Sequence, residues 1–185
     1  MKKAKKVLLL VLCAALLVGA SVAGTVAYLT SSGSVTNTFT TGNVAIKLEE
    51  YDVDGQTGKQ NNNVVTELND LELVPGRKIE KQPFITVDSD SEDCWLFVKV
   101  ENGLGSAVSI NGMENWENLG SGYYRYPEIV KAGAVIDVFT SVTCDAGLGK
   151  ANMDALEGKQ IVITAYAVQS EGVSADAAFT TVQGM

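Results

Sequence analysis

The side chains of this 185-residue chain that could do chemistry are mainly carboxylates. The chain has 22 aspartate and glutamate residues, 14 lysine and arginine residues, three cysteines and no histidine. Without an imidazole there is no Ser–His or Cys–His nucleophile pair, no HExxH zinc site and no histidine-bound iron or copper. The common hydrolase mechanisms are therefore excluded. We expect a protein that is not an enzyme, with no catalytic residue, metal ligand or cofactor.

Two acidic segments have the composition of a calcium loop. Residues 52–57 (DVDGQT) resemble the opening of an EF-hand loop, but the acid of the fifth position is missing and the twelfth position is Asn63. A plain turn is the favoured interpretation. Residues 88–93 (DSDSED) hold four carboxylates, for which we favour a solvated loop and leave weak calcium binding open. No pair of acids stands out for glycoside hydrolysis.

Residues 1–27 have the composition of a secretory signal peptide. Four lysines stand within the first six residues, an apolar run from Val7 to Val18 follows, and small residues end the segment. We expect cleavage between Ala27 and Tyr28, with cleavage after Ala23 or Ala20 as the alternative, and a mature protein in the extracellular matrix or at the cell surface. Membrane contact is then expected only through the uncleaved leader. The alternative is a retained anchor, because the 23 residues from Val7 to Leu29 could span a bilayer.

Export would place Cys94 and Cys144 in an oxidising compartment. A disulfide between them would close a loop of about fifty residues and contribute roughly 4 kcal/mol on the chain-entropy model. Two buried thiols that act as small apolar side chains are the alternative. The sequence leaves both interpretations open.

The mature chain is expected to be strongly acidic. From Tyr28 onward, 10 basic and 22 acidic residues remain, a net charge of −12. Such a body repels the phosphates of nucleic acid and the head groups of anionic lipid. We therefore expect no nucleic-acid partner and no binding to a membrane surface.

The chain after residue 43 is expected to consist mainly of β-strands. Runs rich in β-branched and aromatic residues recur there, and helical periodicity is hard to find. Residues 94–101 (CWLFVKVE) begin with apolar residues on both faces, which is typical of a central strand covered on both sides. The other expected strands lie at 44–51, 107–110, 134–144 and 160–169, with a hairpin of 116–119 and 123–126 around residues 120–122. Residues 79–87 are expected to be an edge strand or a strand start at Pro83, and residues 64–74 are either a short strand or a loop. A polar loop at 56–63, a turn at Asn111 and Gly112, and one or two helical turns at 151–156 complete the list.

These elements predict an all-β fold, a two-sheet antiparallel sandwich of jelly-roll type with little helix after the signal segment. About eight or nine short strands separated by turn signals are typical of that architecture. The expected organisation is a signal peptide at 1–27, an N-terminal arm at 28–43 and a β-sandwich domain at 44–185.

The arm is predicted to act as a donor strand. Its odd positions include Leu29, Val35 and Phe39, whereas the even positions from 30 to 40 are all serine or threonine. One apolar face and one hydroxyl face are typical of a strand added to a sheet edge. Burial of the three apolar side chains, at about 1.5 to 3 kcal/mol each, does not offset about 1 to 2 kcal/mol per ordered residue. Backbone hydrogen bonds to an acceptor edge must be added. A disordered or self-folded arm is the alternative.

Several short motifs follow one another along the chain. They are Gly24-Thr25-Val26-Ala27-Tyr28-Leu29-Thr30 at the end of the leader, Phe39-x-x-Gly42-Asn43-Val44-x-Ile46-x-Leu48, Leu73-x-Pro75-Gly76, Tyr124-x-Tyr126 and the run from Ile161 to Gln169. This succession resembles the TasA/camelysin family of exported Gram-positive proteins over nearly the whole chain. The resemblance implies a leader cut by a signal peptidase of the SipW type. It also implies a jelly-roll subunit of extracellular fibres or, as in other members, a surface metalloprotease.

Pattern and resemblance together predict a secreted structural subunit of biofilm matrix fibres. It would assemble with copies of itself, and with related matrix proteins, by strand donation after signal cleavage. Two alternatives stay open. A camelysin-like cell-surface metalloprotease would need a metal site built from Asp and Glu alone. A monomeric envelope adhesin would use an aromatic patch of Trp116, Tyr123, Tyr124 and Tyr126.

Overall fold

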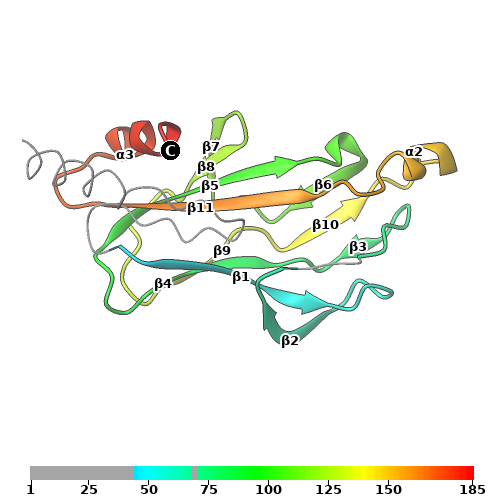
Figure 1. Cartoon of the computed structure of the whole chain (residues 1–185), viewed down its shortest axis with the longest axis horizontal. Coiled ribbons are helices and arrows are strands. Elements are labelled where there is room, and N and C mark those ends of the chain that lie inside the picture. Colours follow the sequence, from blue (N-terminus) through cyan, green and yellow to red (C-terminus); the bar gives the residue numbers. More distant parts are fainter. Residues whose placement is uncertain (1–43, 68–70) are drawn as a thin grey trace, which may run out of the picture. The chain divides into compact units, whose positions relative to one another are not determined.

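The computed structural model describes residues 44–67 and 71–185, which belong to one compact unit of the chain, Ser34–Met185 (Figure 1). The predicted signal segment, its cleavage site at Ala27 and Tyr28, and the donor residues Leu29, Val35 and Phe39 lie outside the described residues. The strands are β1 (Ile46–Val53), β2 (Gln60–Val65), β3 (Lys78–Ile79), β4 (Pro83–Val87), β5 (Cys94–Asn102), β6 (Val108–Asn111), β7 (Glu117–Gly120), β8 (Tyr123–Arg125), β9 (Val135–Asp137), β10 (Ser141–Cys144) and β11 (Ile161–Gln169). The helices are the 3-10 turn η1 (Gly105–Ala107), α2 (Lys150–Asp154) and α3 (Ala175–Gln183).

The strands form three sheets in which every described pairing is antiparallel. The β1 sheet has the order β2-β1-β4-β9, and the β5 sheet has the order β11-β5-β8-β7. A smaller β10 sheet has the order β3-β10-β6. Figure 1 shows β5 and β11 in one layer and β1 and β4 in another. The expectation of a mostly antiparallel β structure is confirmed.

The apolar faces of the β1 and β5 sheets share one core. Ile46 and Ile85 come from the β1 sheet, and Leu96, Val98 and Ala165 come from the β5 sheet. These side chains recur at every second position because successive residues of a strand face opposite sides. Burial of this shared core holds the two sheets together.

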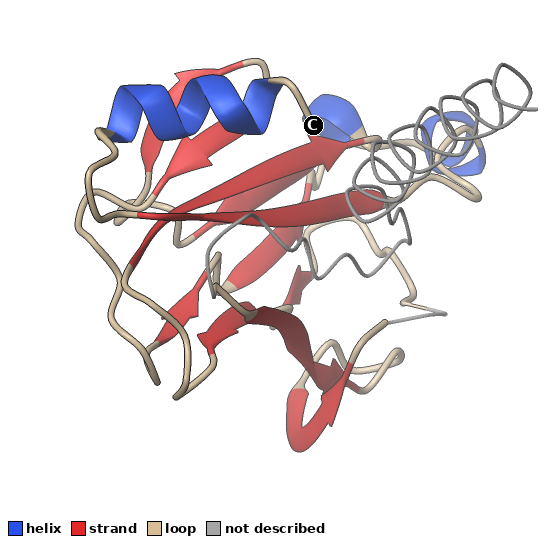
Figure 2. Ribbon diagram, turned by 60° about the vertical axis from the view of Figure 1, so that its left-hand side comes forward, coloured by secondary structure: helices blue, strands red, loops and turns tan. Residues whose placement is uncertain are grey.

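The strand β5 is central, as its sequence predicts. It pairs with β11 on one side and with β8 on the other. Its inward residues join the shared core, and its outward Phe97 packs against Ala178 and Val182 of α3. Figure 2 shows α3 lying along this sheet. The strand is therefore apolar on both faces because a helix covers the face that the core does not.

The prediction of little helix agrees with the structure, and the short helix predicted at 151–156 is confirmed as α2, but α3 was not predicted. The α3 helix begins at a capped end, since the side chain of Ser174 accepts a hydrogen bond from the backbone N–H of Ala177 (3.3 Å) and Asp176 stands in the first turn. None of the helices in the described part of the chain is long and apolar enough to cross a membrane.

The single strand predicted at 134–144 is wrong, because the chain changes sheets in its middle. The N–H of Val138 bonds to the carbonyl of Pro83 in the β1 sheet (2.8 Å), whereas the N–H of Thr140 bonds to the carbonyl of Asn111 in the β10 sheet (2.9 Å). Val138 and Phe139 are both fully buried, which interrupts the alternation of an ordinary strand. The predicted turn at Gly112 lies beside this crossing, where an added Cβ would stand 2.3 Å from Oγ1 of Thr140.

The polar loop predicted at 56–63 is wrong in its second half, where β2 begins at Gln60. Polar side chains of β1 and of the β3–β4 connection support this strand. The amide of Asn61 donates to Asp52 (2.8 Å), and the N–H of Gln60 donates to the carboxylate of Glu80 (3.2 Å). These bonds replace the apolar contacts by which a strand is usually recognised.

Candidate assembly edge

One lateral side of the two facing sheets is closed by a tryptophan. Trp116 precedes β7, the last strand of the β5 sheet, and only 6% of the residue is exposed. Its indole N–H donates to the carbonyl of Asp137 (2.9 Å) in β9, the last strand of the β1 sheet. The ring of Tyr126 meets the indole edge-on at 5.6 Å. We call this side the β7–β9 edge.

The opposite side is formed by β11 and by the first half of β1. Within residues 44–67 and 71–185, β11 is the last strand of its sheet. β4 pairs with β1 from Ile46 to Glu50, but β2 pairs with β1 only from Glu50 onward. Residues 46–49 thus have one neighbouring strand in the described structure. We call residues 46–49 and 161–165 together the β1–β11 edge.

The backbone of β11 presents hydrogen-bonding groups at this edge. The carbonyl of Gln160 accepts from Gly103, and the N–H of Ser170 donates to Asp93, so even-numbered residues bond toward β5. The odd-numbered Ile161 and Ile163 therefore direct their N–H and C=O groups to the other side. Such a row of backbone groups is a template for an added strand.

The side chains of the β1–β11 edge are apolar where they face the core. Leu48 of β1 and Ile161 and Ile163 of β11 are partly buried and pack against the shared core. These side chains are hydrocarbons, so none of them can bond to the facing sheet as the indole of Trp116 does. The two lateral sides therefore differ: one is closed by Trp116, and the other has half-buried aliphatic side chains beside terminal strands.

The two cysteines are free and buried in different sheets, Cys94 at the start of β5 and Cys144 at the end of β10. Burial raises the pKa of Cys94 to about 11, with a further contribution from the charge of Asp93. Burial also raises the pKa of the Cys144 thiol. Of the two interpretations of these cysteines, the structure has the pair of buried thiols and not the disulfide.

The EF-hand-like segment is a turn, as favoured from its sequence. The carboxylate of Asp54 accepts hydrogen bonds from the N–H of Gln56 (3.1 Å) and from the N–H (2.7 Å) and hydroxyl (2.9 Å) of Thr57. The bonds from Thr57 hold the pKa of Asp54 below its ordinary value. The carboxylate is thus occupied by its own loop.

The second acidic segment is held by cations of the chain. Lys47 pairs with Asp88 (3.6 Å) and Lys131 pairs with Asp93 (2.5 Å). In the described ranges, no three acidic or cysteine side chains come together as a group that could hold a metal ion. The carboxylate metal site that a metalloprotease would need is not found in that part of the chain.

The four predicted patch aromatics do not form one patch. Trp116, Tyr124 and Tyr126 pack against the shared core, whereas Tyr123 lies on the outer face with Phe179 of α3 and with Tyr166. The period-two alternation of β8 separates Tyr123 from Tyr124. Beside the β7–β9 edge, an open hollow of about 540 Å³ is lined by Trp116, Tyr126 and three glutamates.

Comparisons with protein-family models, with curated proteins and with solved structures found no match to this chain. The resemblance to the TasA/camelysin family therefore stays a prediction from the sequence motifs. The function must be argued from the two lateral edges and from the pattern of the arm.

Proposed function

We propose that this protein is a secreted structural subunit of extracellular matrix fibres. Its copies join when the N-terminal arm of one copy, residues 28–43, adds as a strand to the β1–β11 edge of the next. The observation that carries this proposal is the contrast between that edge, with terminal strands and half-buried aliphatic side chains, and the opposite edge, which Trp116 closes. The proposal includes a jelly-roll topology for the sandwich, with the β10 sheet as a third sheet beside the two that the sequence predicts.

The β1–β11 edge offers both contributions that a donated strand requires. Ile161 and Ile163 direct backbone groups toward the incoming strand, and each hydrogen bond contributes about 0.5 to 1.5 kcal/mol. Leu48, Ile161 and Ile163 provide an apolar surface on which the aliphatic and aromatic face of the arm can be buried. Neither contribution alone offsets the entropic cost of ordering about ten residues.

Charge favours the arm as the segment that approaches another copy. The mature body is strongly acidic, whereas residues 28–43 contain no charged side chain. An uncharged strand meets no repulsion from an acidic neighbour, while two bodies repel one another and stay soluble until the strand is donated. Signal cleavage by a peptidase of the SipW type frees the arm, and related matrix proteins with similar edges are further partners.

Electron microscopy and sedimentation of the chain that begins at Tyr28 test the proposal. We expect fibres, and we expect a chain lacking residues 28–40 to remain monomeric. The shortened chain keeps its own acceptor edge, so adding it to the intact chain should cap growing fibres and shorten them. Fibres of unchanged length in that mixture would contradict strand donation, and so would an intact chain that stays monomeric at every concentration.

Adjacent substitutions in the arm separate a specific strand from a flexible tail. Phe39→Asn removes an apolar side chain from the donor face, and we expect it to abolish elongation. Thr38→Asn alters the hydroxyl face and is the matched control, which we expect to elongate normally. Equal effects of both substitutions would exclude a two-faced donor strand.

The two alternatives make different predictions in the same material. A camelysin-like metalloprotease would cleave protein substrates in a reaction that a chelator abolishes. An envelope adhesin would keep its ligand after removal of residues 28–40. The hollow beside Trp116 and Tyr126 is one surface that such a ligand could occupy.

A further inference from the structure

Glu50 and Lys81 are the only charged side chains that are buried among the described residues, with 8% and 9% of each residue exposed. The ammonium group of Lys81 donates a hydrogen bond directly to the carboxylate of Glu50. Neither side chain lies in the β1–β11 edge as defined above, so the proposed function does not use this contact. A buried pair of charges needs a separate explanation, because its desolvation is costly.

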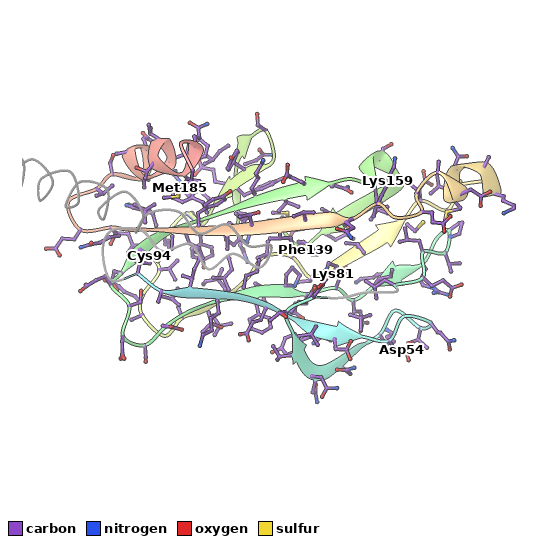
Figure 3. All side chains as sticks on the ribbon, in the orientation of Figure 1. Asp54, Lys81, Cys94, Phe139, Lys159 and Met185 are labelled. Carbon is purple, nitrogen blue, oxygen red and sulfur yellow. The ribbon has the colours of Figure 1, made fainter. Side chains whose placement is uncertain are left out.

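The pair lies where three strands meet. Glu50 of β1 is opposite Val65 of β2 and opposite Pro83 of β4. Lys81 stands in the connection from β3 to β4, two residues before Pro83. Figure 3 marks Lys81 between the upper and lower strands, with Asp54 and Lys159 marked farther to the right. Ile79 and Ile85, on either side of the connection, are fully buried.

The direct contact gives a proton of the ammonium group a path to the carboxylate. When the proton passes from the ammonium to the carboxylate, a neutral amine and a carboxylic acid remain in direct contact. These are the two partners of an amide condensation. Holding them together removes the entropic cost of their encounter, which in well-oriented intramolecular reactions is worth effective concentrations on the order of 10⁵ M or more.

We propose that Lys81 and Glu50 become joined by an intramolecular amide bond. The nitrogen lone pair of Lys81 attacks Cδ of Glu50, and the C–N bond forms. The C–O bond to the carboxyl hydroxyl then breaks, and the hydroxyl leaves with a proton from the nitrogen as one molecule of water. No oxidant, reductant or other reactant takes part. The products carry no charge, so the bond removes the desolvation cost of the ion pair.

The cross-link would close the segment from Glu50 to Lys81, which contains β2 and β3, and fix β1 to the start of β4. Among the described residues, no third acid or base bonds to the pair. The two reacting groups must therefore exchange the proton themselves, and the bond should form gradually after folding. This proposal does not depend on fibre assembly.

Mass spectrometry of the reduced full-length chain tests the bond. After incubation in the folded state, we expect the intact mass to fall below the sequence mass by one water, and tryptic digestion to yield one branched peptide that joins Glu50 to Lys81. Incubation in denaturant should prevent the loss. A folded chain that keeps its full sequence mass after days, with separate peptides for the two residues, overturns the proposal.

The substitution Lys81→Arg keeps the positive charge but removes the amine, so the variant should retain its full mass. Lys78→Arg, at an exposed lysine of β3, is the matched control and should lose water as the unsubstituted chain does. Asp54-Gly55 could also lose water by closing a succinimide, so the position of the loss is decisive. A loss mapped to Asp54, or one that persists in Lys81→Arg, contradicts the cross-link. Should Lys81→Arg fail to fold, the branched peptide of the unsubstituted chain decides alone.

Discussion

The β7–β9 edge and the β1–β11 edge belong to the same pair of sheets but are finished differently. At the first, the buried indole of Trp116 bonds to the backbone of β9, and an ion pair between Arg125 and Glu117 (2.6 Å) ties β8 to β7. At the second, the described structure offers terminal strands and half-buried aliphatic side chains. Large side chains thus protect one edge, and the edge without them is the place where another strand can be added.

The largest expected effect of a single substitution is at the closed edge. Trp116→Ala removes a buried ring and its hydrogen bond to Asp137, and we expect it to lower the free energy of unfolding by about 3 to 5 kcal/mol. Trp116→Phe keeps most of the packing and should cost about 1 kcal/mol for the lost hydrogen bond together with a smaller packing loss. Urea denaturation followed by circular dichroism measures both. A cost below about 1 kcal/mol for Trp116→Ala would show that the indole does not hold this edge.

The second-largest effect on stability is expected from the thiol of Cys94. Cys94 begins β5 and pairs with Gln169 at the end of β11. Burial raises the pKa of Cys94 from 9.0 to about 11, so the folded state binds the thiol proton more tightly than the unfolded state. The contribution of this thiol to the free energy of unfolding is complete below pH 9 and is lost as the pH rises from about 9 to about 11. We expect a loss of roughly 3 kcal/mol over that interval.

Urea denaturation at a series of pH values from 8 to 11, together with thiol labelling of the native protein, measures this dependence. The raised pKa values of Cys144 and Tyr166 act in the same direction, so Cys94→Ala is the control that isolates one thiol. The variant should be less stable than the parent at pH 8 but should lose less stability as the pH rises. Rapid labelling of Cys94 at pH 8 would mean that β11 separates readily from β5.

The sequence predicted the long strands best. The expected strands at 94–101 and 160–169 correspond to β5 and β11 within one residue at each end. Nine residues of strand contain enough β-branched and aromatic side chains to define both the element and its ends. The hairpin around residues 120–122 was equally clear, because its glycines mark the turn.

The elements that the sequence missed depend on distant residues. Residues 138–140 look like the middle of one strand in the sequence. Their partners lie in two different sheets, because Val138 bonds to Pro83 and Thr140 bonds to Asn111. The α3 helix had a local signal, a Ser174 cap before an apolar stripe, but nine residues with two threonines form a weak pattern. The β1–β11 edge was also beyond prediction, because the order of strands in a sheet is set by long-range pairing.

A smaller effect on stability is expected at the β1–β11 edge. Leu48→Ala removes a half-buried side chain of β1, so it should cost about 1 to 2 kcal/mol, less than a fully buried leucine. If this edge accepts the arm, the same variant should elongate poorly as an acceptor while its own arm still donates. Val135→Ala, at a residue of β9 that is 59% exposed, is the control on the other edge. Fibre length in mixtures with the parent chain measures the difference, and equal elongation by both variants would place the acceptor elsewhere.

The smallest effect is expected from the ion pair that accompanies Trp116. Glu117→Gln removes the nearer of the two acidic partners of Arg125 and leaves Asp176 at 3.6 Å. Half of the Glu117 side chain is exposed, so water and salt already weaken the attraction. We expect a loss of about 0.2 to 1 kcal/mol that disappears in urea titrations at high salt concentration. Lys150→Gln, which breaks an exposed pair with Asp154 on α2, is the matched control away from the edge. A loss at Glu117 that exceeded this control several-fold and persisted in salt would mean that the β7–β9 edge depends on charge as well as on the buried indole.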